Sequence, residues 1–150
     1  MIVTIMSDAS HCPKTRSSGY GVWCKSDRGS FQCGGNFKGW VKHSQEAEAK
    51  GLSIAVWAAF YNGVAEIGDH LIIQTDNLGN VNAFDKPNTL PNNHRAIEPL
   101  QWVKNIISEN KCTYDIRHVK AHNPSLGKRN YINHVCDKLA RKAMEDQRGY

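Results

Sequence analysis

Two aspartates follow apolar, β-branched segments in similar contexts. Residues 2–7 (IVTIMS) lead to Asp8, and residues 70–75 (HLIIQT) lead to Asp76. Both segments are typical of buried strands. If the strands are parallel neighbours, both carboxylates lie at the carboxyl edge of a sheet, where open α/β sheets usually place their sites. Close carboxylates repel each other unless a cation joins them, and Mg²⁺ prefers such oxygen ligands. The alternative interpretation is that each aspartate only caps the turn after it.

A third carboxylate is selected by helical phase. The pattern predicts a helix over residues 44–62 with Ser44 as its N-cap. Glu48 shares the apolar face of this helix, whereas Glu46 lies with Lys50 in an i,i+4 surface pair. Burial of a charge is costly without a partner, so Glu48 is a candidate ligand. Alternatively, it is a solvated residue of the first turn, favoured there by the helix dipole. The apolar face consists of Leu52, Ala55, Val56 and Ala59.

Asp137 and His122 are two further candidates, but each can be explained without a functional role. Asp137 lies on the polar side of a predicted last helix, where an i,i+4 pair with Arg141 would account for it. His122 lies in a predicted loop, where a histidine can transfer protons near neutral pH or can simply be solvated. His118 and His122 are four residues apart, but no other histidine or cysteine clusters with them, which argues against zinc.

The elements that position these residues alternate between strand and helix. A turn at Asp27-Arg28-Gly29 joins the second and third strands in a hairpin. Helices separate the first, fourth and fifth strands, which are therefore expected to be parallel. The predicted fold class is α/β: a mixed five-stranded sheet, with three antiparallel and two further parallel strands, and helices on both faces. We expect one domain over residues 1–150. Strands are predicted at 2–7, 19–26, 30–37, 70–75 and 113–119, and helices at 44–62, 77–85, 95–109 and 131–146.

The composition narrows the class of protein. The 150 residues include 19 Lys and Arg against 14 Asp and Glu, a net charge of +5 that suits a polyanionic partner. Five cysteines without a C-x-x-C pair indicate reduced thiols rather than a disulfide framework or a zinc site. No apolar run approaches the roughly 20 residues of a membrane span, and the first residues lack a basic signal region. We therefore expect a cytoplasmic monomer that does not enter a membrane.

Six short segments together resemble type 1 ribonuclease H. Each is weak alone, but all six occur in the order of that family and cover nearly the whole chain. They are SDAS at 7–10, GYGVW at 19–23, AEAKGLSIAVWAA at 47–59, TDN at 75–77, VKAHN at 119–123 and CDKLARKA at 136–143.

The resemblance implies a set of site residues. Asp8, Glu48, Asp76 and Asp137 take the places of the four acidic metal ligands of the family. His122 takes the place of the mobile-loop histidine that assists proton transfer and product release.

The resemblance also implies an activity. The enzyme would hydrolyse the RNA strand of an RNA–DNA hybrid with two Mg²⁺ ions, or with Mn²⁺ in their place. Its products would carry 5′-phosphate and 3′-hydroxyl ends. Family members distinguish RNA from DNA by contacts to 2′-hydroxyls across the minor groove. The implied substrate contacts are Ser10, Ser44, Gln45 and Asn77.

The sequence departs from the family pattern in three places. Ala9 replaces the commoner glycine after the first aspartate, and HSQEA at 43–47 replaces paired asparagines. The interval 86–96 (KPNTLPNNHRA) has few basic residues, so the basic handle of many bacterial relatives is expected to be missing or reduced. Other cations would then contact the hybrid, and the candidates are Lys14, Arg16, Lys120, Lys128 and Arg129.

Two other functions fit the same fold. One is a non-catalytic domain that binds hybrids, which the complete set of carboxylates argues against. The other is a different nuclease of the superfamily, such as a resolvase, an integrase-like core or an exonuclease. The VKAHN and CDKLARKA segments favour ribonuclease H over these.

Overall fold

The order of strands and helices is the predicted one. A computed structural model of the chain describes residues 1–15, 17–37, 39, 41–86, 89–91, 94–119 and 128–147, and only the backbone of 128–131, 133 and 134. The elements are β1 (Ile2–His11), β2 (Ser18–Ser26), β3 (Gly29–Gly35), α1 (Ser44–Tyr61), β4 (His70–Thr75), α2 (Leu78–Asp85), α3 (Ile97–Glu109), β5 (Thr113–His118) and α4 (Lys128–Gln147).

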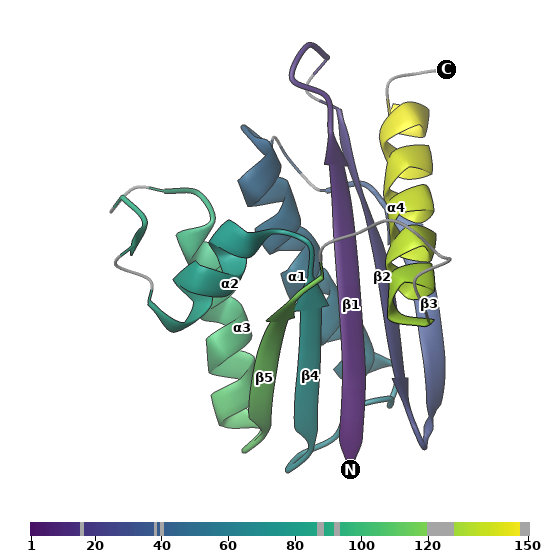
Figure 1. Ribbon diagram of the computed structural model, residues 1–150, viewed down its shortest axis with the longest axis vertical. Helices are drawn as coiled ribbons and strands as arrows, with labels where there is room; N and C mark the ends of the chain where they lie inside the picture. Colours follow the sequence, from purple (N-terminus) through teal and green to yellow (C-terminus); the bar gives the residue numbers. More distant parts are fainter. Residues whose placement is uncertain are drawn as a thin grey trace.

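The strands form one mixed sheet in the order β3-β2-β1-β4-β5 (Figure 1). Strands β1, β2 and β3 are joined by antiparallel pairing, and β4 pairs in parallel with both β1 and β5. The predicted fold class is therefore confirmed. This arrangement makes β1 the strand at which antiparallel and parallel pairing meet.

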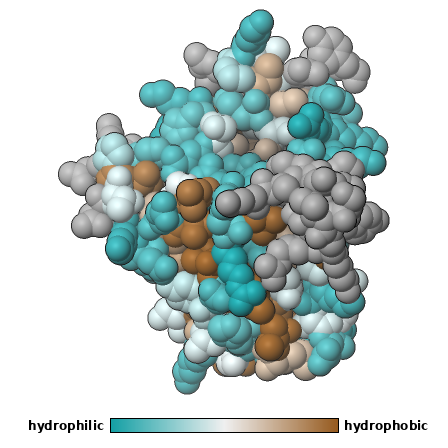
Figure 2. Space-filling model, viewed as in Figure 1, coloured by the Kyte–Doolittle hydropathy of each residue, from teal (hydrophilic) through white to brown (hydrophobic). Residues whose placement is uncertain are grey.

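Helices cover both faces of the sheet. Helix α1 packs on β1 and β2 from one side and contacts α3, while α4 packs on β1, β2 and β3 from the other. The approach of α4 depends on glycine, because a Cβ at Gly21 would overlap the carbonyl oxygen of Cys136, and one at Gly19 the backbone of Met144. Figure 2 shows hydrophobic residues among polar ones on this side of the sheet, beside α4.

The main core lies between the sheet and α1. Alternate strand residues such as Val3 and Ile5 of β1 meet Leu52 and Val56 of α1, and all four are at most 1% exposed. Full burial of one such side chain contributes about 1.5–3 kcal/mol. A smaller cluster on the other face holds α4 against β1, and it consists of Met6, Val119, Ile132 and Cys136.

Several boundaries differ from the sequence prediction. The first strand was expected to end at Asp8 but continues to His11, because β2 remains paired with it as far as Ser18. The N-cap of α1 is His43 rather than Ser44, since the Nδ1 of His43 accepts the amide hydrogen of Glu46. Helix α4 begins at 128, before the predicted 131, and β3 ends at 35 rather than 37.

All five cysteines are free thiols. Among the helices in the described parts of the chain, none is long and apolar enough to cross a membrane.

Candidate metal centre

Asp8 lies where β1 extends past its parallel partner. The pairing of β1 with β4 ends at Met6 and Gln74, whereas its pairing with β2 continues. Asp8 stands opposite Gly21, which lies against α4, so the Asp8 side chain is on the α4 side of the sheet. It is only 2% exposed.

Asp76 and Glu48 approach Asp8 from two other elements. Asp76 directly follows β4, and Glu48 lies near the start of α1 and is 8% exposed. The backbone amide of Ala9 donates to Oδ1 of Asp8 at 2.9 Å and to Oε1 of Glu48 at 3.2 Å. One amide of β1 thus holds both carboxyl groups.

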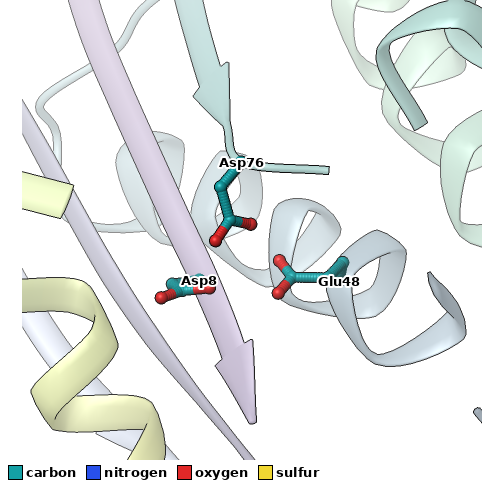
Figure 3. A group of neighbouring side chains, drawn as sticks. All are labelled: Asp8, Glu48 and Asp76. Carbon is teal, nitrogen blue, oxygen red and sulfur yellow. The ribbon is translucent and has the colours of Figure 1, made fainter. Parts of the chain in front are cut away.

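The three carboxyl groups form one cluster. One oxygen from each of Asp8, Glu48 and Asp76 lies within 4.8 Å of the other two. Figure 3 shows the three side chains pointing toward one another from β1, from α1 and from the end of β4. A hard divalent cation takes oxygen ligands of this kind, so the cluster could hold a metal ion.

The electrostatics of the cluster require a cation or a proton. Burial, reinforced by the charge of Asp76, raises the pKa of Asp8 from 3.8 to about 8. Burial raises the pKa of Glu48 well above its usual value, and the charges of Asp8 and Asp76 raise it further. Without a metal, this cluster therefore holds protons near neutral pH.

Asp137 lies near the cluster but outside it. It is on α4, next to the buried Cys136, and its charge contributes to the raised pKa of Asp8. Its carboxylate forms the predicted i,i+4 ion pair with Arg141, whose Nε lies 3.0 Å from Oδ2. The structure thus brings together three of the four predicted ligands and places the fourth on the adjacent helix.

The predicted substrate contacts lie on the elements that carry this cluster or directly follow it. Ser10 follows Asp8 on β1 by two residues, and Ser44 is the first residue of α1. Gln45 donates from Nε2 to Oδ1 of Asn80 at 3.1 Å, and the amide of Asn80 donates to Oδ1 of Asn77 at 2.9 Å.

Asn80, which the sequence analysis missed, thus links the start of α1 to the start of α2. No periodic pattern marks a polar residue that is buried by a distant helix. The structure does not describe three of the other predicted residues, which are His122, Arg16 and Lys120. It describes only the backbone of Lys128 and Arg129. Lys14 is described and is exposed.

Glu46 has a different environment from the one predicted. Its i,i+4 pair with Lys50 is present at 3.3 Å, but the residue is 1% exposed rather than on the surface. Burial alone would raise the pKa of Glu46, yet Arg95, the amide of Lys42 and Lys50 together hold that pKa below its usual value. The Nε of Arg95 lies 2.8 Å from Oε1 of Glu46, so this glutamate anchors the chain before α3.

His118, which the sequence analysis considered only as a zinc ligand, contacts the site. The Nε2 of His118, the last residue of β5, lies 3.0 Å from the carbonyl oxygen of Asp76. This contact depends on the parallel pairing of β4 and β5, which places His118 opposite Thr75.

Comparison with solved structures assigns the fold. Ribonuclease H1 from the archaeon Halobacterium salinarum aligns with 97% of this chain and 99% of its own, with a TM-score of 0.73 and 17% identity. The fold is that of ribonuclease H. The N-terminal ribonuclease H domain of a Mycobacterium tuberculosis protein aligns with 96% of this chain and 99% of its own, with a TM-score of 0.69 and 16% identity.

A third ribonuclease H structure was solved with nucleic acid bound. LC11-RNase H1 in complex with an RNA/DNA hybrid has a TM-score of 0.71 and 13% identity, and the alignment covers 97% of this chain and 98% of the other. No protein-family model matches the sequence, and no curated protein sequence matches it significantly.

Proposed function

We propose that this protein is an endonuclease that hydrolyses the RNA strand of RNA–DNA hybrids. The observation that carries the proposal is the convergence of three carboxyl groups, two of them buried, from three separate elements on a ribonuclease H fold. The structural neighbour that was solved with an RNA/DNA hybrid supports this choice of substrate. A net charge of +5 also favours a polyanionic partner.

Mg²⁺ is the proposed metal. Asp8, Glu48 and Asp76 offer only carboxylate oxygens, the ligands that Mg²⁺ prefers, and include no sulfur or imidazole that would favour zinc. Bound Mg²⁺, as two ions, would supply an activated water and stabilise the negative charge that develops during phosphodiester hydrolysis. Mn²⁺, which takes the same type of ligand, is expected to substitute.

Each proposed ligand is held by its own element. The amide of Ala9 orients the carboxyl groups of Asp8 and Glu48 toward each other, and the turn after β4 presents Asp76. Asp137 is the proposed fourth ligand, supplied by α4, and Arg141 restrains its carboxylate until a metal competes for it. His122, four residues after His118 in the sequence, is proposed to move a proton during product release.

Substrate contacts are proposed around this centre. Ser10, Ser44, Gln45 and Asn77 lie on β1, on α1 and at the start of α2, and offer hydroxyl and amide groups to the sugar-phosphate backbone. Contacts to 2′-hydroxyl groups would make the RNA strand the one that is cut. The proposed products carry 5′-phosphate and 3′-hydroxyl ends.

The test is cleavage of an end-labelled hybrid in Mg²⁺, with duplex DNA and duplex RNA of the same sequence as competing substrates. We expect cleavage of the RNA strand in the hybrid only, and its loss in Asp8→Asn. A matched control is Asp27→Asn, which removes the same charge from the exposed β2–β3 turn and should retain activity. Cleavage of duplex DNA instead would identify another nuclease of this fold, and binding of the hybrid without cleavage would indicate a non-catalytic domain.

A second pair of variants tests the assignment on α1. Glu48→Gln is expected to abolish both metal binding and cleavage. Glu46→Gln lies two residues away on the same helix and removes the partner of Arg95, so it should lower the melting temperature but preserve metal affinity. Equal loss of metal binding in both variants would contradict the assignment of Glu48.

A further inference from the structure

Two hydrogen bonds connect the end of β4 and the turn that carries Asp76 to the neighbouring strand β5 and the residue after it. The amide of Val119 donates to the carbonyl oxygen of Thr75 at 2.9 Å, which continues the parallel pairing beyond the end of β5. Next to this bond, Nε2 of His118 lies 3.0 Å from the carbonyl oxygen of Asp76. A side chain of β5 thus contacts the backbone of a proposed metal ligand.

Two further bonds that the described residues make at this turn are local. The amide of Asn77 donates to Oγ1 of Thr75 at 3.3 Å, and Oδ1 of Asn77 caps α2. These bonds fix how α2 begins. The bond from His118 differs because it fixes the Asp76 peptide relative to another strand of the sheet.

The chemistry of this bond fixes its direction. A carbonyl oxygen only accepts, so Nε2 of His118 must carry the hydrogen. Both the neutral Nε2–H tautomer and the doubly protonated ring carry it.

We propose that His118 is a positioning residue of the metal centre, which holds the Asp76 backbone so that its carboxylate faces Asp8 and Glu48. The inference rests on the proposed function, because it assigns Asp76 as a ligand. Groups that orient metal ligands typically change metal affinity by about 10- to 100-fold when removed. For one bond to the backbone of a ligand, we expect the lower end of this range.

Two substitutions separate this role from packing. His118→Phe keeps a ring of similar shape but has no donor, whereas His118→Gln places an amide nitrogen close to the position of Nε2. A matched control exists at the other end of the same strand pair. There, Nδ1 of His70 lies 2.7 Å from Oγ1 of Thr113, so His70→Phe removes a β4–β5 side-chain bond far along the strand from Asp76.

The experiment is calorimetric titration of each metal-free protein with Mn²⁺ and with Mg²⁺ at a single pH, together with melting temperatures. We expect His118→Phe to bind metal roughly tenfold more weakly than the unmutated protein. His118→Gln should bind within about twofold of the unmutated protein, and His70→Phe should bind as the unmutated protein does.

The outcomes distinguish this inference from the proposed function. Unchanged metal affinity in His118→Phe, or an equal loss in His70→Phe, would overturn the positioning role even if the unmutated protein cleaves hybrids. Weaker metal binding in His118→Phe by a protein that cuts no hybrid would support the positioning role and overturn the nuclease. Absence of metal binding by the unmutated protein would overturn both.

Discussion

The carboxyl cluster should make the metal-free protein less stable as the pH rises. The pKa of Asp8 is about 8 in the folded protein and near 3.8 when unfolded. Between these values the folded state keeps a proton that the unfolded chain has lost, so stability falls with increasing pH. At roughly 1.4 kcal/mol per pH unit, the loss due to Asp8 amounts to about 2 kcal/mol at pH 5 and about 5 kcal/mol at pH 8.

Asp8→Asn should remove this loss. The amide oxygen of asparagine can still accept the Ala9 hydrogen bond, and we allow about 1 kcal/mol for altered hydrogen bonding. In EDTA the variant should therefore be more stable than the unmutated protein by about 4 kcal/mol at pH 8, but by only about 1 kcal/mol at pH 5. The assay is unfolding in urea, followed by circular dichroism, at several pH values.

Metal should reduce the advantage of Asp8→Asn at pH 8 from about 4 to about 1 kcal/mol. Mg²⁺ at about 100 times its dissociation constant would stabilise the unmutated protein by about 2.7 kcal/mol, and Asp8→Asn by much less. The reasoning is refuted if Asp8→Asn gains no stability at pH 8 in EDTA, or if its gain is the same at pH 5. The exposed substitution Asp27→Asn should show neither effect.

Two further predictions concern the elements around the site. Gly21→Ala should lower the free energy of unfolding by about 1–3 kcal/mol, because its Cβ would overlap the carbonyl oxygen of Cys136 and displace α4, and urea unfolding at pH 7 measures this loss. The Arg28 hydrogen bonds lower the pKa of Asp69 to about 2, so the stability that Asp69 contributes above about pH 4 should be lost as the pH falls toward 2. Asp69→Asn should be less stable than the unmutated protein at pH 7, and its melting temperature should fall less as the pH is lowered from about 4 to about 2. An equal fall in both proteins would contradict the assignment of this stability to Asp69.

Much of the fold and part of the site follow from local patterns. Strand alternation and helical spacing place every element in the right order, because each pattern reports which side of a segment is buried. The same reasoning separates Glu48 from Glu46 by the face of α1 on which each lies. In the structure Glu48 does lie with the other two carboxylates, whereas Glu46 does not belong to that cluster.

The rest of the site depends on contacts between distant segments. Glu46 pairs with Arg95, which is 49 residues away, so its i,i+4 pair with Lys50 could not indicate its environment. His118 contacts Asp76 across 42 residues, and Asn80 contacts Gln45 across 35. Periodicity gives the face of an element but not the distant side chain that the fold places against it.

The end of β1 shows how sheet topology creates the candidate centre. A strand that ended at Asp8, as the sequence suggested, would leave this carboxyl group in a turn open to solvent. Instead, β2 holds β1 in place beyond the last β4 pair, and the amide of Ala9 donates to carboxyl oxygens rather than to a neighbouring strand. Glu48 thereby reaches Asp8 from α1, the helix on the opposite side of the sheet from α4. The carboxyl cluster is thus a consequence of one strand that pairs farther with its antiparallel neighbour than with its parallel one.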